Sequence, residues 1–209
     1  MSKLSTITLS ALAVGAAASF TYCSNQAKFI GAWTAVNPTN ITDRMPGATM
    51  ATSLLKIDFV DNLQKTGGAV TLNSDINVTR TIDADSLSQG QPYEVKFAAT
   101  ASVDGTWSYD IDDDDDVLLA LDLAKLKIDL DGSKVTFTQP AATVVPQAHL
   151  DSLATKYIDT WKRDLTGAVS SDLARYTVID DIELSRDGNM MTFEIESPET
   201  KLHFKRDTK

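Results

Sequence analysis

Apolar and polar residues alternate along most of the chain, a pattern typical of β-strands with one buried face. From Val70 the apolar side chains fall on even positions, and from Tyr93 they fall on odd positions as far as Val103. This period of two predicts two long strands. Further strands are predicted at 29–36, 54–60, 117–123 and 202–206. The chain is therefore expected to be mainly β.

Three Asp-Gly pairs stand between apolar runs: Asp104-Gly105, Asp131-Gly132 and Asp187-Gly188. Asp-Gly favours a type I′ turn, which needs positive φ at both central residues. Each pair is predicted to join the runs that flank it, 93–103 with 107–111, 126–130 with 135–137, and 182–184 with 191–195. Three such turns predict an antiparallel meander.

One segment departs from the alternation. Between Pro146 and Gly167 apolar residues recur every three or four positions, from Leu150 through Trp161 to Leu165. This spacing predicts an amphipathic helix over about 147–166, inserted before the last three strands. Pro146 suits its first turn and Gly167 its end. Its apolar face is expected to pack on the sheet.

Composition narrows the range of functions. The chain has 209 residues and a net charge of −10, so one domain is expected and nucleic acid is not an expected partner. Cys23 is its only cysteine, which excludes an internal disulfide and a CxxC motif. With only His149 and His203 as histidines, a histidine-rich metal centre is not expected. We expect no metal and no cofactor.

The N-terminus resembles a bacterial lipoprotein signal. Lys3 is followed by an apolar and small-residue stretch, 9–20, that is too short to span a bilayer, and then by Cys23. The resemblance implies a signal peptide over 1–22, a lipidated Cys23, a tether over 23–28, and one folded domain over 29–209. The protein would then be attached to a bacterial envelope, at the outer membrane. The alternative is cleavage near residue 18, which leaves Cys23 as a free thiol.

The first predicted strand contains Gly31 and Trp33, the Gly-x-Trp of lipocalins, and Arg206 lies on the last strand. With the meander, these residues resemble a lipocalin-like (calycin-type) barrel, and in particular the lipocalin-like lipoproteins of Bacteroidetes-type bacteria. The resemblance implies an antiparallel meander that closes into a barrel. It also implies that a basic residue of the last strand, Arg206 or failing it Lys205, packs over the ring of Trp33.

The expected function is non-enzymatic binding of a small apolar ligand or lipid inside the barrel. The candidate ligand-binding residues are aromatic side chains on predicted apolar faces: Trp33, Tyr93, Phe97, Trp107, Tyr109 and Trp161. The alternative interpretation is that these side chains form a packed core. The protein would then be a protein–protein or glycan interaction module, such as an accessory subunit of an envelope complex.

Two further chemistries come into question, calcium binding and catalysis. The run Asp112–Asp116 resembles part of a calcium loop, but it lacks the glycine and glutamate of an EF-hand. The alternative is a solvated hairpin tip whose charges prevent edge-to-edge association.

No GxSxG, HExxH or glycine-rich phosphate loop is present, so we expect no catalytic residues and no enzyme activity.

Overall fold

The structure, a computed structural model, describes residues 30–38, 40–45, 47–62, 67–83, 85–109, 116–131, 134–138, 144–196 and 199–208. Its strands are β1 (Gly31–Ala35), β2 (Ile41–Met45), β3 (Ala48–Asp61), β4 (Gly67–Ile82), β5 (Tyr93–Tyr109), β6 (Val117–Leu121), β7 (Lys127–Leu130), β8 (Thr136–Thr138), β9 (Val178–Leu184), β10 (Met190–Glu196) and β11 (Glu199–Arg206). The long helix is α2 (Gln147–Leu173), and η1 (Leu123–Lys125) and η3 (Ala174–Tyr176) are single 3-10 turns. The chain is mainly β, as the alternation predicts.

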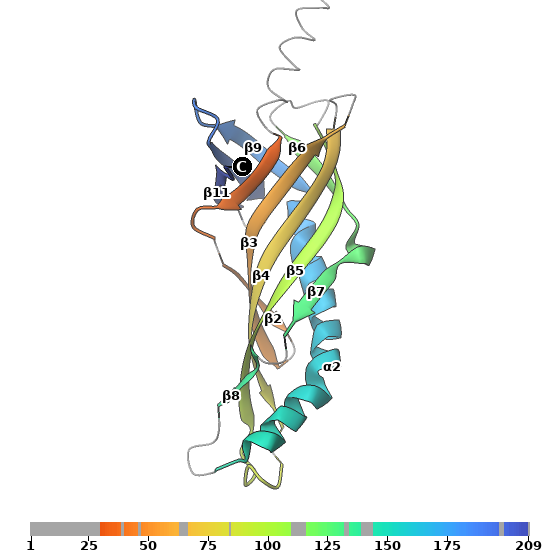
Figure 1. Cartoon of the computed structure of the whole chain (residues 1–209), viewed down its shortest axis with the longest axis vertical. Coiled ribbons are helices and arrows are strands. Elements are labelled where there is room, and N and C mark those ends of the chain that lie inside the picture. The colour runs from red at the N-terminus through yellow and green to blue at the C-terminus, as the bar shows by residue number, and fades with distance from the viewer. Residues whose placement is uncertain are drawn as a thin grey trace, which may run out of the picture.

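Eight of the strands close into an antiparallel barrel, which forms the upper half of the molecule in Figure 1. Their order around the barrel is β1, β11, β10, β9, β6, β5, β4 and β3, and β1 pairs with β3 to complete the ring. Closure pairs both sides of each strand and leaves no free edge there. This architecture is consistent with a lipocalin-like fold, so the predicted fold class is confirmed.

The lower half of the sheet stays open in the part of the chain that the structure describes. β3, β4 and β5 continue past the barrel, where β2 pairs with β3, and β7 and β8 pair one after the other with β5. The helix α2 runs along this open half and rises to the lower rim of the barrel (Figure 1). Of the strands, β7 is the one that the α2 backbone approaches most.

A β-bulge marks the junction between the two halves. The register of β3 against β4 shifts between Leu54 and Lys56, so Leu55 is the extra residue. Before the bulge even-numbered side chains such as Thr52 are buried, and after it odd-numbered ones such as Ile57 are buried. β2 pairs with β3 only before the bulge and β1 only after it. The bulge therefore lets one strand serve both the open half and the barrel.

The interior of the barrel is filled by large apolar side chains. Among those with less than 2% of their surface exposed are Trp33, Ile57, Phe59, Leu72, Phe193 and Phe204. Phe193 and Phe204 stack with their ring centroids 5.0 Å apart. Where α2 meets the rim, Val169, Leu173 and Tyr176 are also buried. The barrel is thus packed as a core.

The predicted hairpin at Asp104-Gly105 is wrong, because β5 runs unbroken from Tyr93 to Tyr109. At Gly105 a Cβ atom would lie 2.5 Å from the backbone oxygen of Ala120 on β6. The glycine is needed for this close approach between strands. The backbone of Asp104 is held in the extended strand as well, since its carbonyl accepts a hydrogen bond from the backbone amide of Asp122.

The other two Asp-Gly pairs differ in outcome. β7 and β8 flank Asp131 but both pair with β5, and within the described residues they do not pair with each other, so the second predicted hairpin is wrong. The third is confirmed, since β9 and β10 pair on either side of Asp187-Gly188. Its turn is not type I′, because Gly188 has a positive φ and Asp187 does not.

The predicted helix is confirmed, and it lies before the last three strands as expected, but it ends later. It begins after Pro146 and continues through Gly167 to Leu173. Val169 and Leu173 extend the buried stripe beyond the glycine. Their burial outweighs the roughly 1 kcal/mol that glycine costs inside a helix.

Candidate functional site

The candidate aromatic residues do not gather in one pocket. Trp107 lies in the barrel, 2% exposed, with its ring edge-to-face against Phe59 and Tyr109. Its indole Nε1 donates a hydrogen bond to the Val60 carbonyl at 3.1 Å. These contacts are those of a packed core. Trp107 and Tyr109 therefore face aromatic neighbours in the barrel.

Trp33 also lies in the barrel, and Arg206 covers it. The Arg206 guanidinium carbon is 4.1 Å from the ring centroid of Trp33, the contact that the lipocalin resemblance implies. The same guanidinium donates to the carbonyls of Ile30 at 2.7 Å and Gly188 at 2.9 Å. Gly31 has a φ of +131°, and a Cβ there would lie 2.8 Å from Arg206 Nη1. Arg206 thus ties both ends of the domain to the β9–β10 turn.

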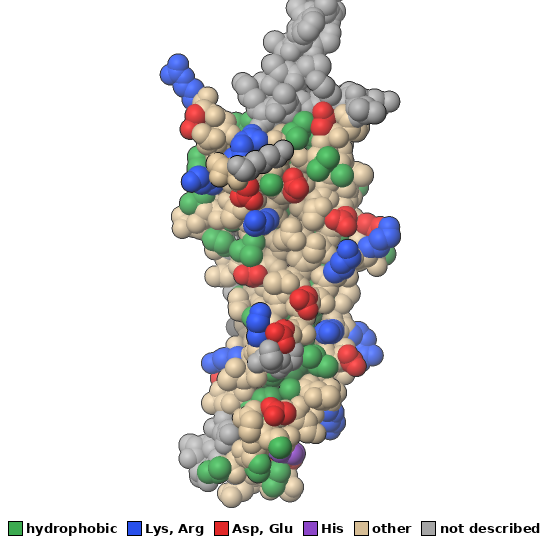
Figure 2. Space-filling model, viewed as in Figure 1, with side chains coloured by type: hydrophobic (Ala, Val, Ile, Leu, Met, Phe, Trp, Pro, Cys, Tyr) green, Lys and Arg blue, Asp and Glu red, His purple; other side chains and the backbone are tan. Residues whose placement is uncertain are grey.

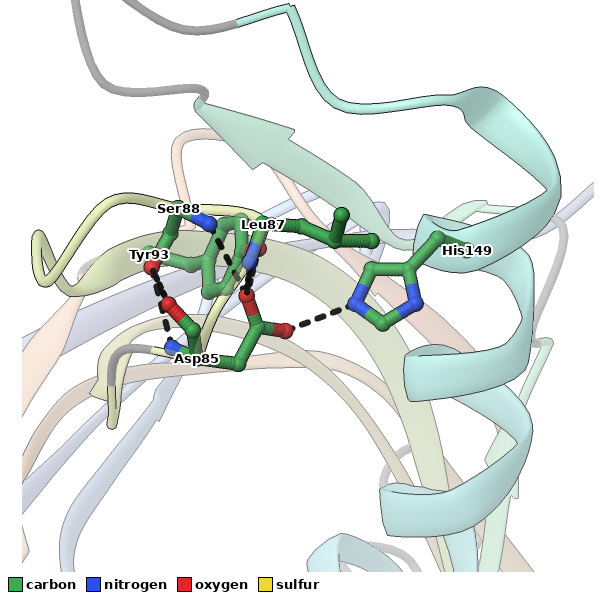
Figure 3. Close-up of polar contacts among 5 residues, drawn as sticks. All are labelled: Asp85, Leu87, Ser88, Tyr93 and His149. Atoms are coloured by element: carbon green, nitrogen blue, oxygen red, sulfur yellow. Dashed lines mark hydrogen bonds and ion pairs between the residues drawn. The ribbon is translucent and has the colours of Figure 1, made fainter.

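Tyr93 lies at the far end of the open half, in a polar cluster with Asp85 and His149 (Figure 3). The Tyr93 hydroxyl donates to Asp85 Oδ1 at 2.8 Å, and His149 Nε2 lies 2.6 Å from Asp85 Oδ2. The backbone amides of Leu87 and Ser88 also donate to Asp85 Oδ1. The cluster fastens the loop between β4 and β5 to the first turn of α2.

The electrostatics of this cluster favour an ionised Asp85. The hydrogen bond from His149, together with those from the loop amides and Tyr93, lowers the pKa of Asp85 to about 2. Burial and the neighbouring Asp85 raise the pKa of Tyr93. An ionised carboxylate only accepts, so His149 Nε2 carries the hydrogen. Ser88 Oγ bonds to the backbone of Asp85, so these residues are not arranged as a nucleophilic triad.

Replacing Asp85 with asparagine should remove part of the acid sensitivity of the fold. The folded-state pKa lies below the ordinary 3.8, so Asp85 stabilises the fold above pH 4 and this contribution is lost as pH falls toward 2. In urea unfolding, Asp85→Asn should be less stable than wild type at pH 7 and nearly equal to it at pH 2. Asp83→Asn, at an exposed position in the same loop, is the matched control. A constant difference between Asp85→Asn and wild type at all pH values would contradict this role.

Hydrophobic side chains gather around a histidine at the lower end of the molecule, where α2 begins (Figure 2). Leu87 is 43% exposed and Val144 is 94% exposed. Along the rest of this face, acidic and basic side chains are interspersed (Figure 2). The other exposed large hydrophobic side chains, Val36, Val60 and Met190, lie on the barrel strands or directly beside them, so this end is one of several places with exposed apolar surface.

Phe97 and Trp161 meet between the open sheet and α2. Their rings stack with centroids 5.1 Å apart, and the ring of Tyr157 also stacks with that of Trp161, at 5.8 Å. Phe97 and Trp161 are buried, whereas Tyr157 is half-buried. The stack therefore runs from the surface of the helix to the inner face of the sheet.

Arg80, on β4, lies next to this aromatic stack. Its side chain is 16% exposed, and Nη1 lies 3.3 Å from Asp164 Oδ2 on α2. The guanidinium carbon is 5.7 Å from the ring centroid of Trp161. Arg80 Nε and Thr52 Oγ1 are buried and have no hydrogen-bond partner among the described residues. Leaving such atoms unpaired costs about 1–3 kcal/mol each. Each of these two atoms could therefore form a further hydrogen bond on this inner face.

Sequence reasoning missed Arg80, although a signal was present. Arg80 has the same parity as Val78 and Ile82, so it is a charged residue on the predicted apolar face of its strand. Asp85 and His149 were also missed as a pair. Only the fold brings these two residues together, 64 positions apart in sequence.

The outer face of the open half carries a separate groove of about 190 Å³. Its polar lining includes Asp75, Asn77, Asp129, Asp131 and Lys134. No group of three or more His, Cys, Asp or Glu side chains within the described residues is placed to hold a metal ion. None of the helices in that part of the chain is long and apolar enough to cross a membrane.

Several predictions fall on other parts of the chain. The signal peptide, Cys23 and the tether lie outside the described residues, and so does the acidic run up to residue 115. Asp116, the last residue of that run, is half-buried before β6. Lipidation therefore stays a prediction, and for the acidic run both interpretations, a partial calcium loop and a solvated hairpin tip, stay open.

Comparison with known proteins yields no match. No protein-family model matches the chain, and no curated protein is significantly similar to it. The eight-strand barrel is therefore the evidence for a lipocalin-like fold.

Proposed function

We propose that this protein is a non-enzymatic binding protein of the bacterial cell envelope, anchored through Cys23, that binds a small apolar ligand or lipid. The observation that carries the proposal is the aromatic stack from Tyr157 through Trp161 to Phe97. It connects the half-buried surface of α2 with the apolar inner face of the open sheet. Ligand pockets are commonly lined by such aromatic side chains.

The proposed site lies beneath α2 and not in the barrel. The barrel interior is filled by its own side chains, whereas the open half is covered by one helix. Leu153, Tyr157 and Ile158 are only partly buried although they pack against the core. A small outward movement of α2 would expose continuous apolar surface on both helix and sheet. The ligand then takes the place of helix–sheet contacts.

Native mass spectrometry tests this function. The full chain is expressed in a bacterium, extracted mildly and sprayed from a volatile buffer, before and after addition of the apolar dye Nile red. We expect a retained lipid in part of the population and one dye molecule bound per chain. Recovery of ligand-free chain alone, with no saturable dye binding, would contradict the proposal.

One observation favours a second candidate function. Trp33, Trp107 and Tyr109 pack against other side chains of the barrel, as expected for an interaction module. In that case the protein would be an accessory subunit whose contacts are on its surface. Affinity purification with no bound small molecule but with one stoichiometric envelope protein would support this alternative.

A further inference from the structure

Arg80 is a basic side chain on an inner face that is otherwise apolar around it. On β4 it lies between Val78 and Ile82, which are both buried, and across the sheet it pairs with the buried Val95. A charged group in such surroundings is costly unless it is paired and hydrogen-bonded. Its position therefore calls for an anionic partner.

The partner present in the structure meets this need only in part. Asp164 Oδ2 contacts one terminal nitrogen of Arg80 at 3.3 Å, while Nε is buried with no hydrogen-bond partner among the described residues. The Asp164 side chain is 38% exposed, so it can turn into water without losing its solvation. The pair is held through a single contact, and its carboxylate side reaches solvent. The guanidinium is thus available to a second carboxylate.

We propose that Arg80 binds the carboxylate of a long-chain fatty acid, which displaces Asp164. A planar guanidinium can donate two parallel hydrogen bonds to a carboxylate, and Nε is one of the donors in that geometry. The alkyl chain lies beneath α2 against Trp161 and Phe97. The proposal rests on the proposed function and names the class of ligand.

Charge balance favours a carboxylate over a phosphate monoester or a neutral head group. Exchanging the Asp164 carboxylate for a ligand carboxylate leaves one anion beside one cation. A doubly charged phosphate would bring an uncompensated charge into a site with few polar groups. An alcohol would leave the charge of Arg80 unpaired once Asp164 had turned away. A fatty acid satisfies both the charge and the unpaired Nε.

The test compares dodecanoate with dodecanol, which have the same chain length and different head groups. Affinities of the full chain are measured by displacement of Nile red. Wild type should bind dodecanoate roughly tenfold more tightly than dodecanol. Arg80→Gln should bind the two equally, because it lacks the charge that distinguishes the head groups. Asp164→Asn, a change at a partly exposed position, should bind dodecanoate more tightly and dodecanol as wild type does.

The outcomes separate this inference from the proposed function. If wild type binds both molecules equally, or if Arg80→Gln keeps the preference for dodecanoate, the fatty-acid assignment is overturned and the apolar site stands. If Asp164→Asn leaves the affinity for dodecanoate unchanged, displacement of Asp164 is overturned even if Arg80→Gln fails to fold. If wild type binds neither molecule nor the dye, both proposals are overturned.

Discussion

Replacing Gly68 with alanine should lower the free energy of unfolding by about 3 kcal/mol, the upper part of the usual range for overpacking. Gly68 lies on β4 in the barrel, where an added Cβ atom would overlap the backbone oxygen of Val60. That oxygen accepts the hydrogen bond from Trp107 Nε1, which would itself be 2.9 Å from the new methyl group. Relief of the overlap requires β3 to move or Trp107 to lose its partner. The melting temperature should fall by about 10 °C.

A matched glycine separates this effect from the general consequence of replacing glycine. Gly167 lies inside α2, and a Cβ there meets nothing within 4 Å. Gly167→Ala should therefore raise stability by up to about 1 kcal/mol, since alanine is the better helix former. Urea unfolding followed by circular dichroism measures both variants. Wild-type stability of Gly68→Ala would show that the Val60 carbonyl is not placed as described.

Replacing Arg206 with alanine should lower the free energy of unfolding by about 3 kcal/mol. Cation–π contact with Trp33 contributes about 1 kcal/mol, and the hydrogen bonds from a charged donor to the carbonyls of Ile30 and Gly188 contribute about 1 kcal/mol each. Local unfolding should increase most in the strand β1 and in the β9–β10 turn, because the Arg206 side chain joins these two segments.

Lys205 is the matched control for Arg206, since it lies on the same strand with an exposed side chain. Lys205→Ala should change stability by less than about 0.5 kcal/mol. Arg206→Lys should recover only part of the loss, because an ammonium lacks the planar fork that reaches both carbonyls. If Arg206→Ala and Lys205→Ala were equally stable, the assigned role of Arg206 would be wrong.

The sequence predicted the fold well where side-chain periodicity decides the structure. The long strand β4, the part of β5 up to Val103, the helix α2 and its place before the last three strands all follow from the spacing of apolar residues. The Asp-Gly pairs were less informative, because glycine also permits close backbone approach, as at Gly105. Local sequence does not distinguish these two uses of glycine. The end of α2 was missed because tertiary burial of Val169 and Leu173 overrides the local signal of Gly167.

The candidate site was harder to predict than the fold. Alternation placed Phe97 and Trp161 on buried faces, but only the three-dimensional arrangement shows that they stack on each other. The division between a packed barrel and an open half depends on the bulge at Leu55. No glycine, proline or other turn residue marks this position in the sequence. Arg80 was detectable as a charged residue on an apolar face. Its partner Asp164 comes from another element, 84 residues later.

The central claim is that a ligand binds beneath α2 in the open half and not inside the barrel. Hydrogen exchange of the full chain with and without saturating Nile red tests it most directly. Bound dye should slow exchange in α2 around Trp161 and in the lower part of β4 near Arg80, and leave β9, β10 and β11 unchanged. Protection that appears in the barrel strands instead, or in no part of the chain, would contradict the claim.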